Sequence, residues 1–181
     1  MSDHPAPPPP DPIGDPHGYQ DFLLAMLGDD DPATVQAGTP SAMRQVAAAA
    51  GVHIRTRPAP GEWSALEVMG HVLDAEIVVS GRYRFIVAHD EPPLIGYDQD
   101  RWVQGLHHND DDVSASLDHF EAIRLANLAM WRRSNPTERS RVGRHDERGP
   151  ESYDLTFRLA AGHDRVHLAQ ARDALRASQR R

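Results

Sequence analysis

Apolar side chains recur three or four positions apart along most of the chain, and the strict alternation typical of a β-strand is missing. This spacing predicts helices and no strand. The predicted helices are 19–27, 41–50, 64–88, 113–133 and 152–176. Helices with one apolar stripe and no sheet to cover must bury that stripe against each other. The sequence therefore predicts an all-α fold, an antiparallel four-helix bundle.

Residues at the predicted helix ends support these boundaries. Ser64 and Glu67 fit the S-x-x-E capping box at the start of the second long helix. Thr39-Pro40 combines a hydroxyl cap with a proline at the first helical position, and therefore predicts another helix start. The acidic stretch 28–36 interrupts the chain before it.

The first fifteen residues are rich in proline and contain little to bury, so we expect residues 1–15 to form a disordered tail. Residues 16–181 then form a single bundle domain. No apolar run approaches the ~20 residues that cross a bilayer, and the N-terminus lacks the pattern of a signal peptide. These features predict a cytoplasmic protein with no membrane partner.

Composition narrows the possible functions. The 181 residues include 19 arginines and no lysine, against 27 acidic residues, which gives a net charge of −8. An acidic protein is a poor general binder of nucleic acid, because it cannot replace the counterions of the phosphates. The absence of cysteine excludes disulfides, zinc–thiolate sites and a thiol nucleophile within the chain.

Most of the eleven histidines have an ordinary explanation. His107 and His108 belong to an acidic loop, and surface positions account for the others named here: His53, His89, His119 and His145.

Three histidines are placed differently. His163 and His167 are four residues apart, which puts both imidazoles on one face of the last helix. An isolated pair of this kind is more often two ordinary surface histidines than a metal site. His71, on the apolar stripe of the second long helix, adds a third inward imidazole. Three neutral nitrogen ligands leave coordination positions open, as catalytic metal sites do. Asp74, three residues after His71, is a candidate catalytic base, although an ordinary solvated carboxylate explains it equally well.

Short motifs around these residues occur in a recognisable order. They are Pro12-Ile13-Gly14, Gly61-Glu62-Trp63-Ser64, His71-x-x-Asp74, Glu91-Pro92-Pro93, Tyr97-Asp98-x-x-x-Trp102, Arg144-His145-x-x-x-Gly149 and His163-x-x-x-His167-Leu168-x-Gln170. This order resembles the DinB/YfiT-like superfamily of metal-binding four-helix bundles, and more narrowly its YfiT-type branch of bacillithiol S-transferases. The resemblance implies that His71, His163 and His167 are metal ligands and that the protein is a homodimer. The insert 28–36 departs from the family pattern.

A divalent ion held by three imidazoles can lower the pKa of a bound thiol or water. Because the chain has no cysteine, a nucleophilic thiol must come from a small molecule. The resemblance to bacillithiol S-transferases implies metal-assisted attack of a low-molecular-weight thiol, similar to bacillithiol, on an electrophilic substrate. The candidate residues that line the mouth for the thiol are Arg82, Arg84, Tyr97, Asp98 and Trp102. Each also has a simpler role, as a surface ion-pair partner or as a packed loop anchor.

Two alternatives use the same ligands: a hydrolase acting with a metal-bound water and Asp74 as base, and a metal-binding bundle without catalysis. A bundle that only binds a protein partner is a third. Zinc or nickel suits three imidazoles best, and copper or iron is also compatible with them.

Overall fold

The computed structural model describes residues 9–12 and 14–180, and part of the predicted N-terminal tail, residues 1–8 and 13, lies outside the described residues. The described chain is mostly helical. Its α-helices are α1 (Pro16–Leu27), α2 (Pro32–Ala50), α3 (Ala65–Ala88), α4 (Gln99–Gly105), α5 (Val113–Arg133), α6 (Pro136–Arg139) and α7 (Tyr153–Ser178). Two short 3₁₀-helices, η1 (Gly51–Arg55) and η2 (His108–Asp110), lie between them.

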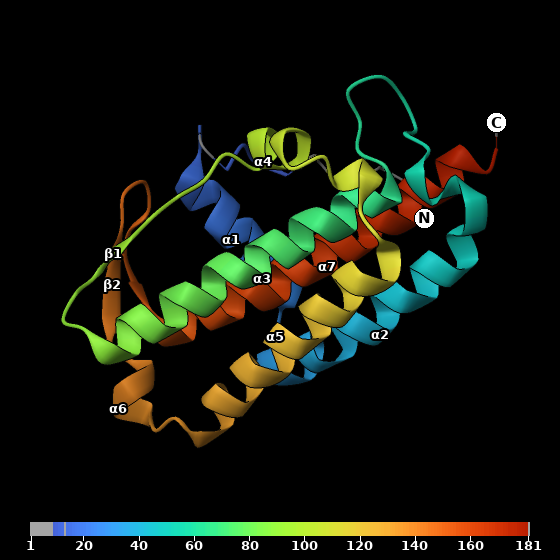
Figure 1. The fold of residues 1–181 in the computed structure, drawn as a ribbon. Coiled ribbons are helices and arrows are strands. Elements are labelled where there is room, and N and C mark those ends of the chain that lie inside the picture. The colour runs from blue at the N-terminus through green and yellow to red at the C-terminus, as the bar shows by residue number, and fades with distance from the viewer. Residues whose placement is uncertain (1–8, 13, 181) are drawn as a thin grey trace, which may run out of the picture.

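The long helices α2, α3, α5 and α7 form the predicted four-helix bundle (Figure 1). Their cross-contacts fix the directions. Thus α3 runs antiparallel to α7, because His71 meets His167 while Tyr83 meets Phe157. By contrast α3 and α5 run parallel, since Glu76 meets Arg124 and Ser80 meets Asn127 further along both helices. The bundle therefore has parallel as well as antiparallel neighbours.

This topology requires the chain to return from the end of α3 to the level of its start. Residues 89–112 make that return and run along α3, as Figure 1 shows. The crossover carries α4 and η2, and its position over α3 brings Tyr97 to within 6.4 Å of His71, measured between ring centroids.

The expectation of no strands is wrong. Strands β1 (Pro93–Leu94), β2 (Val142–His145) and β3 (Gly149–Ser152) form a small sheet in the order β1-β2-β3. The β1–β2 pair is parallel and the β2–β3 pair is an antiparallel hairpin. Strands of two to four residues are too short to show a period of two, so their pattern is invisible in the sequence.

The predicted helix start at Thr39-Pro40 is also wrong. Helix α2 begins eight residues earlier, at Pro32, with the side chain of Asp31 accepting a hydrogen bond from the Thr34 amide. Pro40 is therefore inside a helix, where it cannot donate to the carbonyl of Gln36 one turn earlier. The Arg124 guanidinium on α5 donates to that carbonyl instead, at 3.0 Å.

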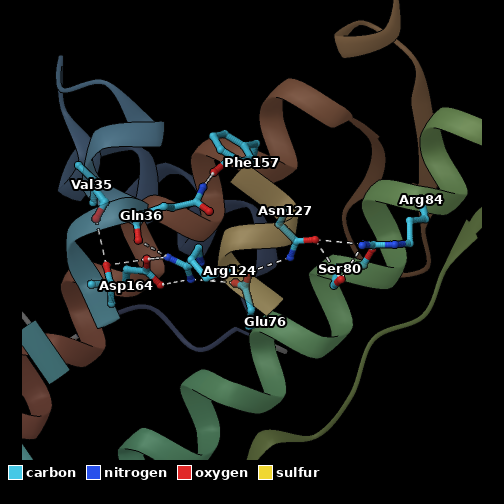
Figure 2. Close-up of polar contacts among 10 residues, drawn as sticks. Val35, Gln36, Glu76, Ser80, Arg84, Arg124, Asn127, Phe157 and Asp164 are labelled. Atoms are coloured by element: carbon cyan, nitrogen blue, oxygen red, sulfur yellow. Dashed lines mark hydrogen bonds and ion pairs between the residues drawn. The ribbon is translucent and has the colours of Figure 1, made fainter. Parts of the chain in front are cut away.

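The core contains two separate hydrophobic clusters, and Arg124 is the centre of a buried polar layer, which Figure 2 shows. Arg124 is 1% exposed and forms ion pairs with Glu76 on α3 and Asp164 on α7. Asn127 donates to the other oxygen of Glu76 at 2.7 Å. Burial opposes the charge of Arg124, but the two carboxylates outweigh it and raise its pKa. This layer links all four long helices, since Gln36 and Asp164 come from α2 and α7.

Helix α1 packs closely on α7. A Cβ atom added at Gly162 would lie 2.0 Å from the backbone carbonyl oxygen of Leu23. The close approach of these two backbones therefore depends on glycine. None of the helices within the described residues is long and apolar enough to cross a membrane.

Gly162→Ala is expected to destabilise the protein by about 1–3 kcal/mol, because α1 must move away from α7. Gly81→Ala on α3 is the matched control, since an added Cβ there meets no atom within 4 Å. That control is expected to gain up to ~1 kcal/mol from the higher helix propensity of alanine. Urea unfolding of both variants measures the difference, and equal stabilities would contradict the close approach.

Candidate metal centre

His71, His163 and His167 come together inside the bundle. Their Nε2 atoms converge: His71 Nε2 lies 3.0 Å from that of His163 and 3.2 Å from that of His167. His71 is 1% exposed and His167 is 5% exposed. His71 lies on α3, and a capping box fixes where that helix starts. The Ser64 side chain accepts from the Glu67 amide, and the Glu67 side chain accepts from the Ser64 amide. The i, i+4 spacing on α7 places the other two rings one turn apart, with centroids at 4.1 Å.

Burial keeps these imidazoles neutral. It lowers the pKa of His71 and of His163 far below the usual value, and it lowers the pKa of His167 to about 4. Three unprotonated nitrogens in one place repel each other unless a proton or a cation lies among them.

The three residues fit a divalent metal ion. Nitrogen ligands at about 2.0–2.1 Å from a metal in tetrahedral arrangement lie roughly 3.3 Å from one another, close to the separations found here. His167 Nδ1 lies 2.7 Å from the side-chain oxygen of Gln170. Donation of the Nδ1 proton to that oxygen leaves Nε2 free to ligate, as metal-binding histidines require. His71 Nδ1 is buried and has no partner among the described residues.

A cavity of about 1140 Å³ adjoins the three rings. Helix α1 forms part of its wall with Tyr19, Phe22 and Met26, and residues 9–12 also line it. The crossover contributes Gly96 and Tyr97. The cavity is large enough for two small reactants, since a pocket for one drug-sized ligand is typically ~300–1,000 Å³.

The five residues predicted to line the thiol mouth are not all placed alike. Arg82, Tyr97 and Asp98 line the cavity, and Asp98 also caps α4 by accepting from the Arg101 amide at 3.0 Å. Trp102 packs against Tyr97 with ring centroids 4.5 Å apart. It supports the cavity wall without lining it.

Arg84 lies elsewhere. Its guanidinium donates to Ser80 and to Asn127 on α5, at 2.6–3.0 Å (Figure 2). The two-residue spacing on a helix separates Arg84 from Arg82 and places it away from the cavity.

Asp74 has a specific partner. Its carboxylate accepts from His108 Nε2 at 2.7 Å, and His108 Nδ1 lies 2.8 Å from Asp111. Burial opposes the charge of His108, but the hydrogen bonds that His108 donates to the two carboxylates outweigh it and raise the pKa of His108. Asp74 is 5% exposed and is not among the residues that line the cavity. Its role as a catalytic base stays a prediction.

His108, expected in an acidic loop, and His145, expected at the surface, are both buried, at 5% and 3% exposure. His108 packs on α3 where Gly70 leaves room, since a Cβ there would lie 2.4 Å from its ring. His145 belongs to β2 and lines the cavity beside Arg82, Arg148 and Glu151. No local pattern marks His108. His145 belongs to the motif Arg144-His145-x-x-x-Gly149, which resembles the family, and that motif is the sequence signal that could have identified it as a cavity residue.

The fold and these histidines define a four-helix bundle with a candidate trihistidine metal centre. The family model described as the DinB superfamily matches residues 46–171, and the chain belongs to that superfamily. All three histidines fall within the matched region.

Two known proteins are similar to this chain. A protein of Oceanobacillus iheyensis named "Putative metal-dependent hydrolase OB0782" is 26% identical over 109 residues, which span 60% of this chain and 63% of the relative. The match thus covers less than two thirds of the relative's length. The structure of YfiT from Bacillus subtilis, described as "a probable metal-dependent hydrolase with an unusual four-helix bundle topology", superposes with a TM-score of 0.72. That match has 17% identity and covers 91% of this chain and 88% of YfiT, so it shows a shared fold.

Proposed function

We propose that this protein is a metal-dependent enzyme that transfers a low-molecular-weight thiol to an electrophilic substrate. The observation that carries the proposal is the convergence of three Nε2 atoms, from buried His71 and His167 and half-buried His163, beside a cavity with room for two reactants. The predicted ligands are His71, His163 and His167, and zinc or nickel is the proposed metal. When bound there, the divalent ion keeps its full charge and favours the ionised form of a thiol or water beside it.

The residues of the chain hold and surround this centre. Gln170 fixes the ring of His167 by accepting from Nδ1. Trp63 packs beside His71, with ring centroids 5.1 Å apart, and helps to exclude water from that side. Tyr97 covers the cavity near His71.

The placement of Asp74 supports a thiol rather than water as the nucleophile. A divalent ion lowers the pKa of bound water to about 7 and holds a bound thiol as the thiolate, so both nucleophiles are accessible to such a centre; the hydrolase proposed from the sequence also needs Asp74 to reach the water as a base. Asp74, the base expected for hydrolysis, is engaged by His108 and is not among the cavity-lining residues. In the proposed transfer a sulfur–carbon bond forms, the bond from that carbon to its leaving group breaks, and the thiol proton departs with the leaving group.

Hydrolysis is the second candidate, because both similar proteins are described as metal-dependent hydrolases. It needs the same three ligands. The two functions differ in whether turnover depends on an added thiol.

Turnover of 1-chloro-2,4-dinitrobenzene by the metal-containing protein is expected to require an added thiol, such as bacillithiol, and to yield the aryl thioether and chloride. Absorbance of the thioether measures the rate, and hydrolysis of p-nitrophenyl acetate without thiol is followed in parallel. Rapid ester hydrolysis that thiols do not accelerate, with no thioether formed, would reject the transferase in favour of the hydrolase.

Removal of the metal separates catalysis from a structural role. Chelation is expected to abolish turnover while the helical circular dichroism signal persists. Cooperative unfolding on chelation would instead indicate a structural ion. Homodimer formation also stays a prediction.

A further inference from the structure

Arg82 is a buried cation that forms no ion pair with the carboxylates of the described residues. It comes from α3, is 9% exposed and lines the same cavity as the three histidines. Its Nη2 donates to the Ile95 carbonyl oxygen at 2.6 Å and lies 3.2 Å from His145 Nε2. Its Nε has no hydrogen-bond partner in the described part of the chain, and none of the described carboxylates forms an ion pair with it.

The neighbouring groups leave this charge unmatched. Arg148 forms an ion pair with Glu151, which is fully buried and also accepts from Gln20 at 2.9 Å. Glu151 thus pairs directly with Arg148, and its attraction for Arg82 is weaker than the repulsion between Arg82 and Arg148. Burial lowers the pKa of His145 to about 4, so its ring adds no charge. Glu147 and Asp98 line the same cavity, and neither forms an ion pair with Arg82.

A buried guanidinium that has lost its hydration and has no counterion is destabilised. Burial and the nearby Arg148 accordingly lower the pKa of Arg82. An anion that enters the cavity would relieve this cost, and a carboxylate matches the planar donor fork of arginine.

Arg82 and the three histidines line one cavity, and so does Tyr97, whose ring lies 6.4 Å from the ring of His71. A small molecule bound in this cavity therefore has both the Arg82 guanidinium and the histidines available to its polar groups.

We propose that Arg82 binds a carboxylate of the small molecule that reacts at His71, His163 and His167, which makes the substrate an organic acid. This inference rests on the proposed function for its reacting end. A monoanion fits better than a phosphate dianion, because one positive charge is unmatched and Glu151 lies close by.

The test compares two thiols of equal length, 3-mercaptopropionate and 3-mercapto-1-propanol, by calorimetric titration of the metal-containing protein. The carboxylate is expected to bind at least tenfold more tightly. Arg82→Gln is expected to remove that preference, whereas Arg84→Gln, the matched control two residues away, is expected to keep it. If the carboxylate bound only to the metal ion, the Arg82→Gln and Arg84→Gln variants would both prefer 3-mercaptopropionate over 3-mercapto-1-propanol by the same factor. That result would overturn the inference.

Arg82→Met is a second neutral variant of similar length, in case Arg82→Gln fails to fold. Arg82→Lys retains the charge and is expected to keep part of the preference. Equal binding of the two thiols by the unsubstituted protein would refute the inference without any variant. Tighter binding of inorganic phosphate than of 3-mercaptopropionate would refute the carboxylate class.

Propionate and 1-propanol, titrated by NMR, repeat the comparison without sulfur. A preference for propionate that depends on Arg82 would support the carboxylate site even if no thiol turnover occurred. Thiol turnover with equal affinity for charged and neutral thiols would leave the transferase standing and reject the carboxylate site. The two proposals therefore fail separately.

Discussion

Alanine at His163 is expected to weaken binding of the metal by more than about 100-fold and to abolish turnover. The reason is that the change removes one of three direct nitrogen ligands, whereas loss of an outer hydrogen bond to a ligand costs about 10–100-fold. His71→Ala and His167→Ala are expected to have the same effect, since the three Nε2 atoms share one point of convergence. Elemental analysis of the purified variants measures the metal content.

His119→Ala is the matched control, because His119 is an exposed residue on α5. It is expected to keep full metal content and turnover. Gln170→Leu provides a graded comparison, because it removes only the oxygen that accepts from His167 Nδ1, and about 10–100-fold weaker binding is expected. Full metal stoichiometry in any two of the three ligand variants would show that the ligand set is wrong.

Removal of the Asp164 carboxylate is expected to destabilise the bundle by about 3–5 kcal/mol. Asp164 is 2% exposed and holds two nitrogens of Arg124, so Asp164→Ala leaves part of a buried guanidinium unpaired. It also removes the hydrogen bond from Thr39 on α2, at 2.8 Å. For a chain of this length the loss corresponds to a fall in melting temperature of roughly 10 °C.

Asp118→Ala is the control for this substitution. Asp118 also pairs with an arginine, Arg44, but at the surface, where its side chain is 64% exposed. An exposed pair contributes about 0–1 kcal/mol, so the control is expected to unfold near the unsubstituted protein. Thermal unfolding by circular dichroism compares the two variants. A similar small loss in both would mean that Glu76 alone satisfies Arg124.

The prediction of helices from the sequence succeeded where local signals agree. The capping box at Ser64 and Glu67 sets the start of α3, and apolar spacing sets the stripe on which His71 lies. The start of α2 was predicted wrongly because a proline at position 40 is compatible both with the first position of a helix and with a tolerated place inside one. Only the contact of Arg124 with the Gln36 carbonyl distinguishes a helix start from a tolerated interior proline.

The candidate site shows the same division. The i, i+4 spacing of His163 and His167 is a property of one helix, and the sequence carries it completely. Arg82 and Arg84 look equivalent in the sequence, yet one lines the cavity and the other bonds to α5. Whether an arginine of α3 lines the cavity or bonds to α5 depends on which helix lies beside that face of α3. The path of the crossover 89–112 determines which helices these are.

The sequence by itself determined that this protein is helical, where α3 begins, and that three imidazoles face inward, because short-range spacing and capping decide these features. The tertiary structure decided the partner of Asp74, the burial of His108 and His145, and the isolation of Arg82 as an unmatched charge. These features arise from contacts between segments far apart in the chain, such as Asp74 with His108 and Arg82 with His145. No periodicity within a single helix encodes such contacts, since they depend on how the helices are packed and connected.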